Sequence, residues 1–148
     1  MANSTQYAKT VAASPSKIST TELHGRVRVA YADFTAAGAQ ETINMFKLPD
    51  GARIIGGRLN HAALGSSTTV SVGHAAYTQA DGTVVALDVD EYKAAASSAS
   101  ATGSAVAATT ALGENSLVDA PDGLIVTATT AGANATGLIT VQMTYVLD

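Results

Sequence analysis

The three histidines are the side chains best suited to acid–base or metal chemistry in this sequence, and their spacing favours neither role. His24, His61 and His74 are far apart, none lies two or four residues from another, and none belongs to a His-Glu-x-x-His motif. Folding could still bring them together. An isolated histidine, however, is more often a surface residue or a hydrogen-bonded core residue than a ligand. We therefore predict no catalytic histidine and no metal site.

Other reactive patterns are also missing. The chain has no cysteine, which excludes disulfides, thiolate metal sites and thiol nucleophiles. It contains no Gly-x-Ser-x-Gly nucleophile elbow and no glycine-rich phosphate loop, and Gly56-Gly57 lacks the further glycines of a dinucleotide fingerprint. A carboxylate pair for glycoside hydrolysis stays open, but aromatic residues that would stack on sugars are few and scattered. We predict a binding or building element without catalytic residues or cofactor, not an enzyme.

The acidic run Asp88-Val89-Asp90-Glu91 has two interpretations. Its carboxylates could offer oxygens to Ca²⁺, which takes about six to eight of them, but the Asp/Asn-Gly spacing of a calcium loop is missing. The same residues fit a capping box, in which Asp88 caps a helix and Glu91 reaches back. Good helix formers follow in 92–96. We therefore favour one short helix over a calcium site.

Length and composition indicate one folded domain, which we place at residues 21–148. The chain has 148 residues, enough for a single hydrophobic core. Hydrophobic residues make up 47% but aromatic residues only 5%, so the core consists mostly of small aliphatic side chains. Charged residues make up 14%, against about 25% in a typical domain. Such a surface suits a chain that is covered by its neighbours in an assembly.

The net charge of −4 is unevenly distributed. Residues 1–58 carry seven cations and four anions, whereas residues 59–148 carry one cation, Lys93, and eight anions. This polarity could orient subunits in an assembly, because complementary potentials fix register. Alternatively, the two halves interleave in one sandwich and the asymmetry disappears in space.

Nucleic acid and membranes are not expected as partners. No cluster of Lys and Arg with interleaved aromatic residues is present. No apolar stretch approaches the roughly 20 residues of a membrane span. The N-terminus lacks the basic segment and apolar run of a signal peptide, so we expect synthesis in a cytoplasm.

Alternating side chains predict an all-β domain. In Arg26–Tyr31 the arginines alternate with Val27, Val29 and Tyr31, the period of a strand with one wet face. The clearest alternation is in the last strand, which places Ile139, Val141, Met143, Tyr145 and Leu147 on one face. Further strands are expected at 43–48, 52–59, 68–73, 83–87 and 124–129. About seven or eight short strands without a βαβ rhythm predict an antiparallel β-sandwich or jelly roll.

Glycine, proline and low-complexity segments set the boundaries between these strands. Pro49-Asp50-Gly51 predicts a turn, Asp81-Gly82 predicts a hairpin, and Gly56-Gly57 predicts a bulge or the close approach of another backbone. Residues 1–20 have no period and are expected to form a flexible N-terminal arm. Residues 97–116 are low in complexity and in charge, so we expect a long surface loop there.

The stretch Met45-Phe46-Lys47-Leu48-Pro49-Asp50-Gly51-Ala52-Arg53-Ile54-Ile55-Gly56-Gly57-Arg58-Leu59 resembles a recurring pattern in small virion proteins of tailed bacteriophages. In that pattern a strand ends in Lys-Leu-Pro, turns through Gly-Ala-Arg and leaves as an apolar strand. The similarity continues through 64–73, an Asp-Gly turn, a short helix after Val89-Asp90, and the last strand at 136–146. It covers about residues 25–146, without the arm and the 97–116 loop.

The resemblance implies a jelly-roll fold and a place on the phage head. It favours the capsid decoration or cement proteins, which bind the major capsid protein on the outer surface of the expanded head, commonly as trimers over capsomer junctions. It implies no active-site residues. Two other classes stay open: a tail, tail-tip or head-fibre component, and a glycan-binding or receptor-binding module. The latter would need a row of exposed aromatic residues that this sequence lacks.

Overall fold

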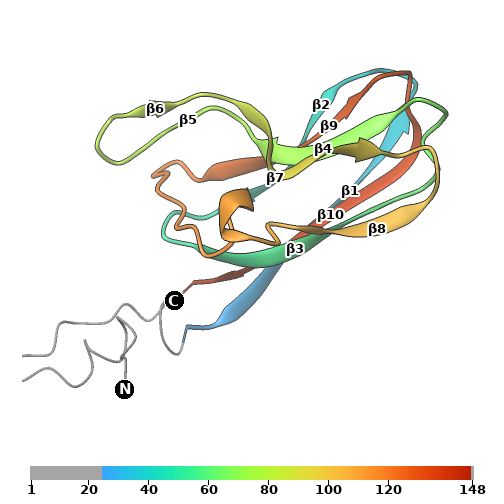
Figure 1. Ribbon diagram of the computed structural model, residues 1–148. Helices are drawn as coiled ribbons and strands as arrows, with labels where there is room; N and C mark the ends of the chain where they lie inside the picture. The colour runs from blue at the N-terminus through green and yellow to red at the C-terminus, as the bar shows by residue number, and fades with distance from the viewer. Residues whose placement is uncertain (1–24, 148) are drawn as a thin grey trace, which may run out of the picture.

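Two four-stranded antiparallel sheets pack face to face in the computed structural model, which describes residues 25–147 (Figure 1). The predicted arm, residues 1–20, and His24 lie outside the described residues. The first sheet has the order β1 (Val27–Ala37), β10 (Thr136–Val146), β3 (Arg53–His61) and β8 (Thr102–Val106). The second has the order β2 (Thr42–Leu48), β9 (Leu124–Ala131), β4 (Thr69–His74) and β7 (Asp88–Ser97).

The pairing of these eight strands confirms the predicted jelly roll. The first strand pairs with the last, β2 with β9, β3 with β8, and β4 with β7, and every pair is antiparallel. Such nested pairing winds the chain into two sheets that share one core. A small hairpin, β5 (Tyr77–Thr78) and β6 (Val84–Val85), is inserted between β4 and β7.

The core lies between the two sheets and consists of aliphatic side chains. The predicted alternation of β10 is confirmed: Ile139, Val141 and Met143 are fully buried, and Tyr145 and Leu147 pack partly against the core. The second sheet contributes Val70, Val72 and Val126 among others. Because few aromatic residues take part, the two sheets are held together mainly by Val, Leu, Ile and Ala.

The predicted irregularity at Gly56-Gly57 is confirmed in both of its forms. The register between β3 and β10 shifts at this point, since Thr144 lies opposite Gly56 and Tyr145 opposite Ile54. Gly56 has a φ of 136°, a backbone angle that residues with a Cβ atom rarely adopt. A Cβ on Gly57 would lie 2.5 Å from the carbonyl oxygen of Gln142. Glycine therefore permits a bulge and a close backbone approach next to each other.

The predicted short helix after Asp88 is wrong, because Asp88–Ser97 forms strand β7. The Asp88 carboxylate does accept a hydrogen bond from the Asp90 amide, as in a cap, but the chain then extends. In β7, Lys93 pairs with Val72 of β4, and the side chain of Tyr92 is buried. Helix propensities differ by less than about 1 kcal/mol per residue, so sheet pairing and this burial outweigh the preference of the alanines.

The predicted loop at 97–116 is also different in the structure. It contains β8, which pairs with β3, and the 3₁₀ turn η1 (Thr110–Leu112). Its small residues suit the sheet edge, where Gly103 lies beneath larger side chains of β3. Among residues 25–147, η1 is the only helical segment, and no helix there is long and apolar enough to cross a membrane.

Candidate interaction surfaces

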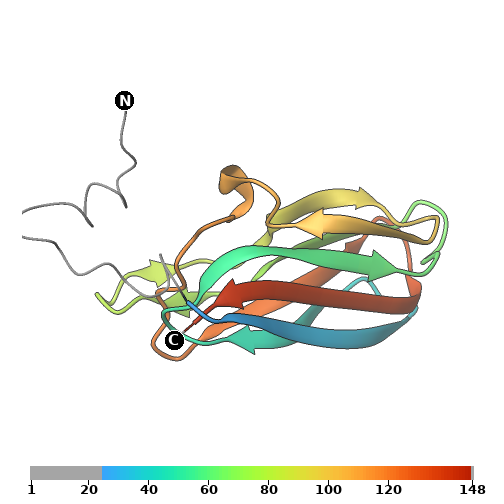
Figure 2. The ribbon, with the colours of Figure 1, turned by 90° about the horizontal axis from the view of Figure 1, so that it is seen from below.

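The solvent side of the first sheet, which we call the outer face, carries exposed apolar side chains along β1. Figure 2 looks onto this sheet, with β1 at one edge. Val27, Val29 and Tyr31 are 64%, 61% and 58% exposed. The alternation predicted for Arg26–Tyr31 is correct in period, but the valines and Tyr31 lie on the wet side. Of the alternate residues, Ala30 and Phe34 pack against the core, whereas Arg28 is exposed.

The apolar stripe on β1 continues into polar side chains across the sheet. Tyr31 lies opposite Gln142 of β10, which in turn lies opposite Arg58 of β3. Val29 lies opposite Thr144 in the same way. The outer face therefore combines an apolar stripe along its edge strand with polar side chains across β10 and β3.

A hydrogen-bonded carboxylate, Asp33, lies on β1 at the edge of the outer face. Asp33 accepts a hydrogen bond from the Thr140 hydroxyl at 2.6 Å and another from the Tyr31 hydroxyl. These two bonds lower the pKa of Asp33 below its ordinary value, with the Thr140 bond the larger cause. The bond to Asp33 likewise raises the pKa of Tyr31. Asp33 thus stays ionised and is satisfied within the subunit.

Arg58 presents a guanidinium on the outer face beside β8. Its Nε donates a 2.8 Å hydrogen bond to the Asn60 side-chain oxygen. Both side chains lie over Gly103, because a Cβ there would come within 2.6 Å of the Arg58 Nη2 atom. Among the described residues, the two terminal nitrogens of Arg58 make no hydrogen bond. A guanidinium in this state can receive a carboxylate in a two-point contact.

β1 is also an edge strand of eleven residues, paired within the described chain only with β10. The unpaired backbone groups of an edge strand can add a further strand from another chain. Exposed apolar side chains on such an edge increase this tendency. The β1 edge is therefore a second candidate for contact with a partner.

The hairpin predicted at Asp81-Gly82 is confirmed, and it extends away from the sandwich (Figure 1). The Asp81 carboxylate accepts a hydrogen bond from the Thr83 amide at the turn. The turn of the hairpin is tied to the body, because Asp119 accepts a hydrogen bond from the Ala80 amide at 3.1 Å. Val84 is 74% exposed. The hairpin therefore carries an apolar side chain and an acidic turn into solvent.

The charge asymmetry of the sequence persists in space, even though the two halves of the chain interleave. The charged residues of the first sheet are three arginines and one aspartate, namely Arg28, Arg53, Arg58 and Asp33. Acidic residues gather around the hairpin, where Asp119 and Glu91 both contribute to the raised pKa of Tyr77, after burial. Asp81 adds a further negative charge at the turn. The molecule thus has a basic sheet and an acidic hairpin end.

The two described histidines are each the last residue of a strand, β3 for His61 and β4 for His74. Both are buried, and the Nδ1 atom of each lies within hydrogen-bonding distance of the next carbonyl oxygen, 2.8 Å for Ala62 and 2.9 Å for Ala75. His74 also packs edge-on against Tyr77. These contacts fit hydrogen-bonded core residues, and the absence of a catalytic role stays a prediction.

The carboxylates of residues 25–147 do not assemble into a metal centre. No group of three His, Asp or Glu side chains in this range is placed to hold a metal ion. Within the acidic run, the Asp88 carboxylate is used in its own turn, where the Asp90 amide is the largest cause of its lowered pKa. The run thus has a local structural role.

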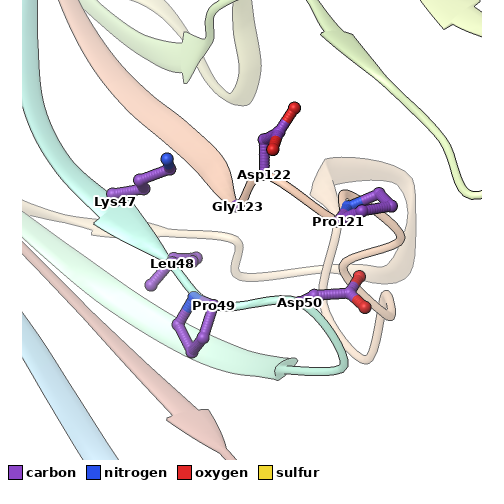
Figure 3. A pocket seen from close by; sticks show the side chains of 7 residues that line it. All are labelled: Lys47, Leu48, Pro49, Asp50, Pro121, Asp122 and Gly123. Carbon is purple, nitrogen blue, oxygen red and sulfur yellow. The ribbon is translucent and has the colours of Figure 1, made fainter.

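An open depression of about 350 Å³ lies where β2 ends and β9 begins (Figure 3). The Asp50 carboxylate in it accepts a 2.8 Å hydrogen bond from the Ala120 amide, so it holds two loops together. Lys47 and Asp122 remain for polar contact with a partner. The residues that line it include no serine, threonine, cysteine or histidine for nucleophilic catalysis. Its lining consists of Lys47, Leu48, Pro49, Asp50, Pro121, Asp122 and Gly123.

The sequence interpretation did not identify the outer face as an exposed apolar surface. A signal was present, because Ala30, Phe34 and Ala36 continue a second alternation beyond Tyr31. That alternation is longer than the one made by the valines. Most of its members are alanines, which are less hydrophobic than the exposed valines of the first alternation.

No protein-family model matches the sequence, and a comparison with curated proteins gives no match. Three solved phage capsids contain chains of similar fold. A chain of the cyanophage Pam1 capsid asymmetric unit superposes with a TM-score of 0.62 at 22% identity, covering 84% of this chain and 86% of that one. A chain of the Ralstonia phage GP4 capsid gives 0.63 at 21% identity, with 84% and 86% covered. A chain of the capsid of Helicobacter pylori bacteriophage KHP30 gives 0.56 at 20% identity, with 82% and 87% covered. This chain shares the jelly-roll fold of those capsid chains.

Proposed function

We propose that this protein is a non-enzymatic component of a bacteriophage virion, which binds the outer surface of the expanded head and stabilises it as a decoration or cement protein. The observation that carries the proposal is the likeness in fold to chains of three phage capsids, over more than four-fifths of both chains in each comparison. The similar coverage in both directions means that the matched chains are also small single jelly rolls. The partner would be the major capsid protein.

The surfaces of the molecule support a role in assembly. The outer face and the hairpin expose apolar side chains that water alone covers in the isolated subunit, including Val29, Tyr31 and Val84. Exposed apolar groups of this kind often mark sites of contact with other proteins.

A cement protein stabilises a shell by mass action. If it binds several capsid subunits only in their expanded arrangement, its binding free energy adds to the stability of that arrangement and not to the stability of the precursor. A trimer, which we favour, would contact three positions at once and gain avidity. The protein would be made in the host cytoplasm and would join the head after expansion.

Co-sedimentation tests this function directly. The purified full chain would be mixed with expanded heads that lack it, with unexpanded procapsids of the same phage as the control. We expect saturable binding to expanded heads alone, with hundreds of copies per particle. Absence of binding to either particle would refute the proposal and would favour a tail or fibre location.

The N-terminal segment gives a second test. Residues 1–20 come before β1, which begins at Val27 and has a free edge that can accept a strand. We propose that this segment grips the capsid or an adjacent subunit. Deletion of residues 1–20 should therefore weaken head binding while leaving the unfolding temperature unchanged. Unchanged head binding would contradict this role.

A further inference from the structure

The β5–β6 hairpin is held to its own subunit, because Tyr77 packs against the core and Asp119 accepts a hydrogen bond from the Ala80 amide. Its two short strands still leave Val84 exposed, and Leu87 follows them with an exposed side chain. Exposed apolar side chains of this kind often mark a contact with another protein. The exposed side of the hairpin is therefore suited to insertion into a neighbouring surface.

The outer face has the properties that such a hairpin requires. It is open, it exposes Val29 and Tyr31 to receive an apolar side chain, and Arg58 presents two terminal nitrogens that are unused among the described residues. The hairpin presents the opposite charge in Asp81, whose carboxylate is exposed at the turn. Lys47 lies near the start of the hairpin, beside Tyr77 and Thr78, whereas Asp81 lies at the turn.

We propose that copies of this protein associate head to tail, with the hairpin of one subunit docked on the outer face of the next and Asp81 paired with Arg58. A contact between two different surfaces of one chain is heterologous, and such contacts close into rings when the rotation permits. A cyclic trimer is built from contacts of this kind. The proposal concerns the protein without its capsid, so it does not depend on the proposed function.

The charge pair is tested by exchanging its two members in the full chain. Sedimentation velocity over a concentration series would compare the wild type with Arg58→Glu, Asp81→Arg and the double variant. Each single reversal places like charges together and should weaken association at least about tenfold. The double variant should recover most of the wild-type association.

Matched reversals elsewhere control for net charge. Lys93→Glu on β7 and Glu114→Lys after η1 change the charge by the same amount outside the proposed contact. Both should associate like the wild type. Thermal unfolding of every variant would identify any that fails to fold.

The absence of cysteine permits an independent measurement. Arg58→Cys and Asp81→Cys each carry a single thiol, because the natural chain has none. When the two variants are mixed under mild oxidation, a disulfide-linked pair should form faster than in either variant alone. Formation of this disulfide reports how close the two positions lie, even though each variant has lost one of the two charged side chains.

Three outcomes would overturn the inference. The first is a wild-type chain that stays monomeric at every attainable concentration. The second is a set of single reversals with no effect, or a double variant that does not recover. The third is preferential cross-linking within one variant alone, which would indicate a contact of like surfaces. Failure of head binding in the co-sedimentation experiment would leave these results unchanged, so the two proposals fail separately.

Discussion

Replacing Gly57 by alanine should destabilise the protein far more than replacing Gly103 by alanine, although both added methyl groups would overlap a neighbour. At Gly57 the obstacle is backbone: the new Cβ would lie 2.5 Å from the Gln142 carbonyl oxygen and 3.2 Å from the Met143 Cα. At Gly103 it is the far end of flexible side chains, with the Arg58 Nη2 atom at 2.6 Å. The added methyl group would therefore meet a backbone atom at Gly57 and a movable side chain at Gly103.

The difference in free energy follows from what can move. Strand β10 is paired with β1 on one side and β3 on the other, so its backbone cannot shift without loosening a ladder. Overpacking of this kind costs about 3 kcal/mol, the upper part of the usual range. Alanine recovers about 1 kcal/mol by restricting the unfolded chain, which leaves a net loss of about 2 kcal/mol for Gly57. At Gly103 the displaced Arg58–Asn60 hydrogen bond costs about 1 kcal/mol, so the net change is near zero.

Thermal unfolding of both variants beside the wild type would measure these changes. At about 4 °C per kcal/mol, Gly57→Ala should lower the melting temperature by about 8 °C, whereas Gly103→Ala should leave it nearly unchanged. Gly103→Ala should still weaken self-association, because it displaces Arg58 from the outer face. Equal losses in the two variants, or a Gly57 variant as stable as the wild type, would refute the reasoning.

Two further predictions concern stability. The hydrogen bonds from Thr140 and Tyr31 hold the pKa of Asp33 below its ordinary value, so its contribution is complete above the unfolded pKa of about 3.9 and is lost as pH falls through the folded value. Asp33→Asn should remove this part of the acid dependence in urea midpoints measured across that range, and an unchanged dependence would contradict the assignment. Tyr92 is 4% exposed, so Tyr92→Ala should cost about 4 kcal/mol in chemical unfolding. Tyr92→Phe keeps the ring and is the control. A much smaller loss of unfolding free energy in Tyr92→Ala would mean that neighbouring side chains fill the space left by the ring.

Several features were predictable from sequence because neighbouring residues decide them. The alternation of β10 repeats over Ile139, Val141 and Met143, and such a period is compatible with one buried face only. The turn at Asp81-Gly82 depends on a side chain that bonds its own backbone. The irregularity at Gly56-Gly57 requires residues without a Cβ atom, and the sequence shows these directly. Together with the count of strands, these features predict an antiparallel β-sandwich or jelly roll.

The strand β7 could not be predicted, because its local preferences favour another structure. Its alanines favour a helix, and the Asp88 carboxylate makes the same local contact in a helix cap and in the observed turn. Only the pairing of Lys93 with Val72, and the pocket that receives Tyr92, decide for a strand. β8 could not be predicted for a related reason, because its small residues form a strand only through pairing with β3.

The fold class and the net separation of charge follow from the amino-acid sequence, because the strand periods and the counts of ionisable residues are properties of the chain. Which side of β1 meets water depends instead on packing in three dimensions. Two alternations compete in that strand, and the sandwich has room for Ala30 and Phe34 where the first sheet covers the second. Val29 and Tyr31 are consequently left on the outer face beside Arg58. The candidate interaction surface therefore arises from packing between the sheets, which selects one of the two alternations present in the sequence.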